Sequence, residues 1–317
     1  MPAPPERRRD HLLALFIGLI VAALMCVTAS QLSSGELVGN VWRFSAAGRV
    51  EFTLYNSILL AITLVALVLA QRFFARRSSL GNLVIGLTLL AVEFYLLHFL
   101  SQAYHELLSK YYDFPRIVVY MGISGPGILL LLAALFLGSA WGMRRARRAG
   151  RAEEELLLQI AATDQKPGQK PIAPPSRRPQ RILSLLLYPL GFAACTTILF
   201  SAHSGLNDRV AGLQLETESL AVAFLAAIGI VALTATSGES TLGLRVAGII
   251  TVLLGLFSSL THSLNFTFSD YFNSEFLLYF SSIHFILLGL LLLLLARGIS
   301  HARQAGQAQE HELHALG

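Results

Sequence analysis

The sequence predicts an all-α integral membrane protein of eight transmembrane helices, arranged as two parallel four-helix repeats. Hydrophobic residues make up 54% of the 317 residues and charged residues only 14%, whereas a soluble domain carries about 25% charged residues. The apolar residues gather in runs of roughly 20, the length that crosses a membrane. Short motifs of the first half also recur in the second half. The two cysteines, Cys26 and Cys195, lie inside apolar runs, which excludes a disulfide framework.

The apolar runs place the expected spans near residues 12–31, 53–73, 80–103, 117–143, 182–202, 217–236, 242–264 and 275–297. The first run is interpreted as a span, because no small-residue cleavage site follows it. Residues 144–181 are charged and then proline-rich, which predicts a helical extension of the fourth span and then a linker. The expected domains are a first repeat (1–143), the extension and linker (144–181), a second repeat (182–298) and a cytoplasmic tail (299–317).

The distribution of Lys and Arg predicts the orientation. If both termini are cytoplasmic, the outer segments hold only Arg43, Arg49, Lys110, Arg116 and Arg209 of the 24 basic residues. Cytoplasmic loops carry the excess of positive charge in membrane proteins. We therefore expect a multi-pass protein of the plasma (inner) membrane, with the N and C termini in the cytoplasm. The net charge of +5 then reflects topology and the lipid bilayer, and nucleic acid is not expected as a partner.

Four short matches indicate a duplication, each displaced by about 160 residues or slightly more. Leu80-Gly81 with Gly86 matches Leu242-Gly243 with Gly248, and residues 56–58 match 218–220. Residues 109–113 match 269–273, and Ser34-Gly35 matches Ser204-Gly205. Each repeat has an even number of spans, so the two repeats are expected to be parallel and related by an axis along the membrane normal.

Polar residues concentrate toward the outer ends of the expected spans. Tyr95, His98 and Gln102 share one face of the third span, and His262 and Asn265 form a similar stripe on the seventh. Polar side chains in spans usually face the bundle or a wet cavity, although interfacial Tyr and His residues also lie at headgroup depth. The sequence thus predicts an outward-facing polar pocket, with ligand-binding candidates Glu93, Tyr95, His98, Gln102, Ser124, His262, Asn265 and His284.

The function expected from this pocket is binding or transport of a small polar or lipid-derived ligand. Glu93 is the one acid deep inside a span, and an intramembrane carboxylate is costly, so Glu93 is the candidate proton or cation site. The alternative is a non-catalytic membrane subunit or assembly factor. Its outer loops, around Tyr111-Tyr112-Asp113 and Tyr271-Phe272-Asn273, would then contact a protein partner.

A second alternative is a haem- or metal-binding redox protein. Histidines on facing helices can ligate haem iron or a metal, and His98, His262 and His284 are the candidate ligands. No cofactor is otherwise indicated. No Walker motif, glycine-rich dinucleotide turn, HExxH or CxxC is present, so an ATP-driven or nucleotide-dependent role is not expected.

Residues 122–125, Gly-Ile-Ser-Gly, resemble the GxSG string of rhomboid proteases, and Trp42-Arg43 lies in the first outer loop as a Trp-Arg pair does in that family. The resemblance implies Ser124 as a nucleophile. The family places its catalytic His in the sixth span, where this chain has none, and His284 of the eighth span is the nearest candidate base. We assign no catalytic residue and expect a non-enzymatic protein.

Overall fold

The computed structural model describes residues 5–43, 54–110, 127–164, 178–210, 217–263 and 282–315. All regular structure in these ranges is α-helical, which confirms the all-α prediction. The helices are α1 (Pro5–Arg43), α2 (Leu54–Arg76), α3 (Leu80–Lys110), α5 (Ile128–Asp164), α6 (Arg178–Val210), α7 (Thr217–Thr236), α8 (Leu242–Ser263) and α10 (Ser282–Ala315).

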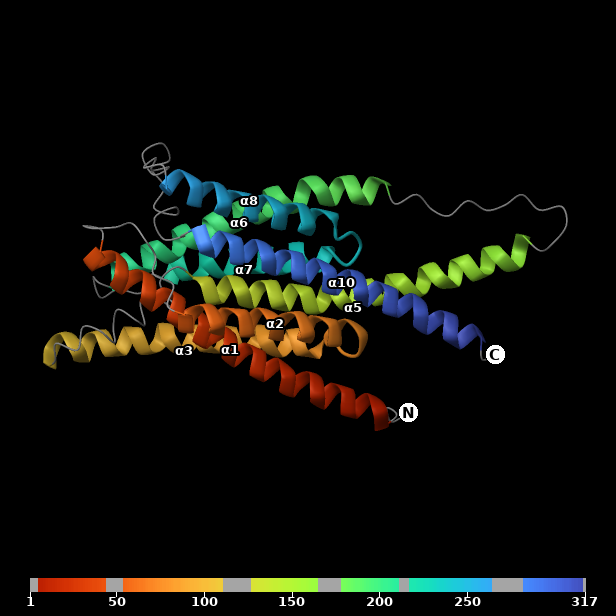
Figure 1. Ribbon diagram of the computed structural model, residues 1–317, viewed down its shortest axis with the longest axis horizontal. Helices are drawn as coiled ribbons and strands as arrows, with labels where there is room; N and C mark the ends of the chain where they lie inside the picture. The colour runs from red at the N-terminus through yellow and green to blue at the C-terminus, as the bar shows by residue number, and fades with distance from the viewer. Residues whose placement is uncertain are drawn as a thin grey trace.

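The helices lie side by side along one long axis (Figure 1). Both termini lie at the same end of this bundle, together with the short connections from α2 to α3 and from α7 to α8 (Figure 1). We call this end the terminal end and the other the distal end. α5 and α10 continue past the rest of the bundle at the terminal end.

Seven of the described helices are long and apolar enough to cross a membrane. The eighth, α8, contributes a shorter described apolar stretch, Leu242–Phe257. As a helix of 22 residues, α8 is about 33 Å long at 1.5 Å per residue, close to the ~30 Å of a bilayer's hydrocarbon core. The prediction of a multi-pass membrane protein is therefore consistent with every described helix.

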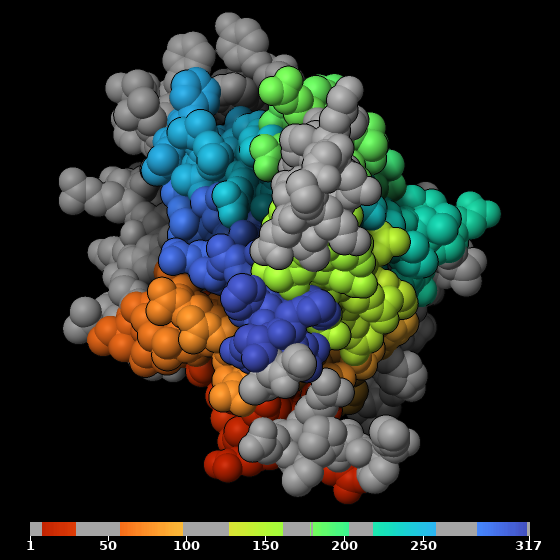
Figure 2. Space-filling view, turned by 90° about the vertical axis from the view of Figure 1, so that its right-hand side faces the viewer, coloured from red at the N-terminus to blue at the C-terminus, as the bar shows by residue number. Residues whose placement is uncertain are grey.

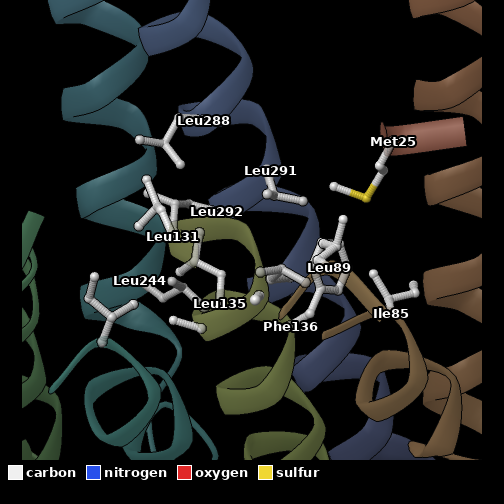
Figure 3. Packing of buried hydrophobic residues seen from close by; sticks show 14 of the residues in the cluster. Met25, Ile85, Leu89, Leu131, Leu135, Phe136, Leu244, Leu288, Leu291 and Leu292 are labelled. Carbon is white, nitrogen blue, oxygen red and sulfur yellow. The ribbon is translucent and has the colours of Figure 1, made fainter. Parts of the chain in front are cut away.

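α5 and α10 form the centre of the bundle. Within their apolar windows 67% and 56% of the residues are buried, against at most 39% in the other long apolar helices. α5 packs on α3, α7 and α10, while α10 packs on α8, α2 and α5. Figure 3 shows leucines of these two helices, such as Leu135 and Leu292, inside the core. The outer helices leave large apolar side chains exposed, as expected for surfaces that face lipid.

One buried polar cluster joins three helices near the terminal end. The Gln71 and Asn82 side chains form a reciprocal amide pair, with N–H···O distances of 2.7 and 3.2 Å. Asn82 Nδ2 also donates to Ser139 Oγ at 3.0 Å, and that hydroxyl donates to the Phe136 carbonyl at 2.9 Å. All three side chains are at most 2% exposed. Since an unsatisfied buried amide is costly, this cluster fixes the register of α2, α3 and α5.

Beyond the apolar core, α5 and α10 stay together as a polar helix pair. Arg151 donates to Gln309 Oε1 at 2.7 Å, and Gln307 donates to Glu153 Oε2 at 3.0 Å. Of the three predicted domain boundaries, 143/144 and 298/299 fall within these continuous helices, and 181/182 falls within α6. The division into membrane repeats, linker and tail stays a prediction.

Candidate functional site

A cavity of about 110 Å³ lies between α1, α2, α5 and α10. Aliphatic side chains supply most of its wall, and the cavity is partly open at the bundle surface. In Figure 3 the side chains of Met25 on α1 and Leu291 on α10 point toward each other; both line this space. The lining residues are Met25, Thr28, Ala29, Leu60, Thr63, Leu64, Leu67, Ile128, Leu131, Leu132, His284, Leu287, Leu288, Leu291 and Leu294.

Among the described residues, three polar side chains contribute to this wall: Thr28, Thr63 and His284. The hydroxyl oxygens of Thr28 and Thr63 are 2.7 Å apart. Each hydroxyl also lies within hydrogen-bond distance of the carbonyl four residues earlier in its own helix, at 2.8 Å for Thr28 and 2.9 Å for Thr63. The two threonines thus form a fixed pair that connects α1 to α2.

The polar groups lie in the distal part of the cavity, where Ala29 and Leu60 also line the wall. α1 runs toward the distal end, whereas α2 and α10 run away from it. Thr28 is therefore more distal than Met25, Thr63 than Leu67, and His284 than Leu294. From His284 to Leu294 the rise along α10 is about 15 Å, half of the ~30 Å hydrocarbon core. Leu294 lies three residues, about 4.5 Å, before Arg297, so the cavity extends from near the terminal end of the apolar run of α10 to the level of His284.

Of the predicted ligand-binding residues whose side chains the structure describes, His284 alone lines this cavity. Glu93 is 0% exposed within α3 but is not among the lining residues. The Tyr95 side chain is 65% exposed and lies on the outside of the bundle. The remaining candidates, His98, Gln102, Ser124, His262 and Asn265, lie outside the described side chains, and their assignment stays a prediction.

The sequence analysis did not single out Thr28 and Thr63. Each is a lone hydroxyl residue in an apolar run, and threonine in a span commonly bonds only to its own helix backbone. The available signal was weak: Thr28 lies three and seven residues after the buried Met25 and Val21, on one helix face. That spacing places Thr28 inside the bundle but does not indicate its partner on α2.

Metal ligation receives no support from the described part of the chain. There, no group of three or more His, Cys, Asp or Glu side chains is arranged to hold a metal ion. The side chains of His98 and His262 lie outside that part, as do the loops at 111–113 and 271–273 that were considered for protein contacts.

No protein family, curated protein or solved structure matches this chain. The functional argument therefore rests on the cavity and the bundle that forms it.

Proposed function

We propose that this protein binds a neutral, long-chain lipid through a hydroxyl end group, in the cavity between α1, α2, α5 and α10. The observation that carries the proposal is the division of the cavity wall. Thr28, Thr63 and His284 lie in its distal part, whereas apolar side chains alone, among the described residues, line its terminal part. An amphiphilic lipid has a matching arrangement, because a small polar group lies at one end of its hydrocarbon chain.

The apolar wall argues against a small polar ligand. Such a ligand would lose its hydration along a surface that offers few hydrogen-bond partners, at a cost of several kcal/mol. An apolar cavity of roughly 150 Å³ stays dry and takes up a benzene-sized molecule. The 110 Å³ here holds a short segment of chain, and the partly open side lets the rest of the chain lie along the bundle.

The threonine pair favours a ligand group that donates a hydrogen bond. Two hydroxyls carry two protons, and these are shared among the Thr28–Thr63 contact and the carbonyls of Leu24 and Leu59. Both protons are therefore engaged in hydrogen bonds within the protein, while lone pairs of the hydroxyl oxygens remain available toward the cavity. An alcohol donates to such lone pairs, whereas an ionised carboxylate only accepts.

The duplication, the orientation in the membrane and the transport role predicted from sequence are part of this proposal. We infer a duplicated bundle, supported by two equivalent contacts: a Cβ at Gly86 would meet Leu137, and a Cβ at Gly248 would meet Leu293. The arginines near the terminal end support cytoplasmic termini in a plasma membrane, so the hydroxyl end of the ligand lies in the outer part of the cavity. Transport of the ligand, with Glu93 as a proton site, is the further step of the same hypothesis.

The test is photo-crosslinking of the full-length protein in nanodiscs, with a diazirine-labelled fatty alcohol as probe. In the wild-type protein we expect labelled peptides to come from the lining residues of α2 and α10, such as Leu67 and Leu291. Ala29→Phe places a large side chain in the cavity and should abolish this labelling. The matched control is Ala23→Phe, the same change at an exposed position of α1, which should retain it.

The polar end is tested separately. Thr28→Val and Thr63→Val keep the side-chain shape and remove a hydroxyl. One net hydrogen bond is worth about 1 kcal/mol, so each should weaken fatty-alcohol labelling roughly fivefold. A diazirine-labelled alkane of equal length should be unaffected. Labelling that survives Ala29→Phe, or that is spread over exposed leucines such as Leu69 and Leu254, would contradict the proposed site.

A further inference from the structure

A second pocket, of about 370 Å³, lies near the terminal end between α8 and α10. Arg245 of α8 and Leu293, Arg297, Ser300, His301 and Gln304 of α10 line it. The end-on view of Figure 2 shows α10 in dark blue beside α8 in light blue at this end. The volume is at the lower end of the roughly 300–1,000 Å³ typical of small-ligand sites. None of these residues lines the apolar cavity, so the two sites are independent.

The α10 residues of this pocket form one continuous helix face. Arg297, Ser300, His301 and Gln304 follow the i, i+3, i+4, i+7 spacing of a helix surface. Arg297 Nε donates to His301 Nε2 at 3.4 Å, and His301 Nδ1 lies 3.1 Å from Gln304 Oε1. Because Nε2 accepts from the arginine, Nδ1 carries the proton and donates to Gln304. The three side chains support one another, which orients the Arg297 guanidinium.

The pocket carries positive charge that no acidic group balances. Across the described residues, neither Arg245 nor Arg297 forms an ion pair with Asp or Glu. Arg303, six residues further along α10, differs in this respect: its Nε lies 3.6 Å from Glu153 Oε2, and it donates to the Glu239 carbonyl at 3.0 Å. A guanidinium has five N–H donors, and only one of those of Arg297 is directed to His301. The remaining donors are available to an anion.

The pocket lies at the border between apolar and polar surface. Arg245 is in the first turn of α8, at the start of its apolar stretch, and Arg297 directly follows the leucine-rich run of α10. Leu293, one turn deeper, supplies an apolar wall beside the two arginines. Such a pair of cations above a hydrocarbon contact matches a phosphodiester attached to acyl chains. Basic pockets between transmembrane helices bind anionic headgroups in the same way.

We propose that the pocket formed by Arg245, Arg297 and the Ser300–Gln304 face binds the phosphate of an anionic phospholipid, in the leaflet at the terminal end of the bundle. The two guanidiniums hold the phosphate oxygens through charge-assisted hydrogen bonds, the Ser300 hydroxyl lines the same pocket, and Leu293 contacts the upper part of an acyl chain. The lipid acts here as a bound structural partner that ties α8 to α10.

The experiment is native mass spectrometry of the full-length protein. The protein in detergent is mixed with equimolar dioleoyl-phosphatidylglycerol and dioleoyl-phosphatidylcholine and is then released from the detergent in the spectrometer. We expect selective retention of phosphatidylglycerol. Each arginine near a membrane surface adds roughly fivefold to the affinity for anionic lipid, so Arg245→Gln combined with Arg297→Gln should reduce retention by tenfold or more. The matched control, Arg72→Gln with Arg76→Gln, removes two exposed arginines at the same end and should retain the lipid.

A second variant avoids removing either arginine. Gln304→Glu introduces a carboxylate at an exposed position of the pocket face and should also lose phosphatidylglycerol by competing for the guanidiniums. Equal loss in the Arg72/Arg76 control would overturn the proposal, because retention would then reflect general surface charge. The source of the phosphate is tested by titrating inorganic phosphate. If inorganic phosphate binds with the same dependence on Arg245 and Arg297, while phosphatidylglycerol is retained no better than phosphatidylcholine, the lipid assignment is wrong.

Discussion

Gly150 of α5 lies directly against the main-chain carbonyl of Arg303 in α10, so closely that a Cβ at position 150 would collide with that oxygen. The reverse contact is also present, since a Cβ at Gly306 would collide with the carbonyl of Arg147. Both glycines lie in similar strings, ARRAGRA at 146–152 and ARQAGQA at 302–308. The two central helices therefore cross through a reciprocal glycine contact, in which each backbone approaches the other.

This contact predicts that side chains at the crossing destabilise the protein. Gly150→Val and Gly306→Val should each lower the free energy of unfolding by about 1–3 kcal/mol, because the backbone on the opposite side cannot move away easily. The measurement is the apparent melting temperature of the detergent-purified protein. Ala308→Val, at an exposed position of α10, is the control and should have little effect. An unchanged melting temperature for both glycine variants would mean that the crossing is not tight.

The buried amide cluster predicts non-additive effects. Asn82→Leu removes both hydrogen bonds that Gln71 makes with it and leaves a buried amide unsatisfied, at a cost of about 1–3 kcal/mol. Gln71→Leu should cost a similar amount. The double variant should cost clearly less than the sum of the two, because no orphaned amide of the pair remains. Thermal unfolding of the four proteins gives the coupling, and strict additivity would show that the pair does not act as a unit.

Glu93 should behave differently from Asn82, although both are 0% exposed. A carboxyl inside a membrane is costly and is typical of functional positions, and residues kept for function often reduce stability. We therefore expect Glu93→Gln to melt at the wild-type temperature or above. Proton-coupled uptake of the ligand into proteoliposomes should be lost in the same variant. A melting temperature as low as that of Asn82→Leu would assign Glu93 a structural role, and full uptake would remove it from the mechanism.

An absorption spectrum, oxidised and reduced, with metal analysis of the same sample, distinguishes lipid binding from the redox alternative. Among the described residues, the apolar cavity is lined by one imidazole, that of His284, whereas bis-histidine ligation of haem needs two. We expect neither a Soret band nor a stoichiometric metal. If a Soret band is present, His98→Ala and His262→Ala should each abolish it, and the redox function would replace the one proposed here.

The candidate site could be predicted only in part from the sequence. His284 was singled out as a polar residue in the eighth span and does line the cavity, because its position two turns into an apolar run already implied an inward or interfacial location. Tyr95 belonged to the same predicted pocket by helical spacing but is 65% exposed. Spacing establishes which residues share a helix face, but it does not establish whether that face meets lipid or another helix.

Composition and run length by themselves determined that this chain is helical and apolar enough to cross a membrane several times. In a bilayer, the backbone must satisfy its hydrogen bonds within each segment, so the helices follow from local sequence. Only the tertiary structure decided which helices meet. The pairing of Thr28 with Thr63 and of Gln71 with Asn82, and the placement of Arg245 and Arg297 in one pocket, depend on how the helices rotate and pack. Lipid tails are as apolar as leucine, so apolar patterning specifies that packing weakly, and close contacts between small and polar side chains decide it.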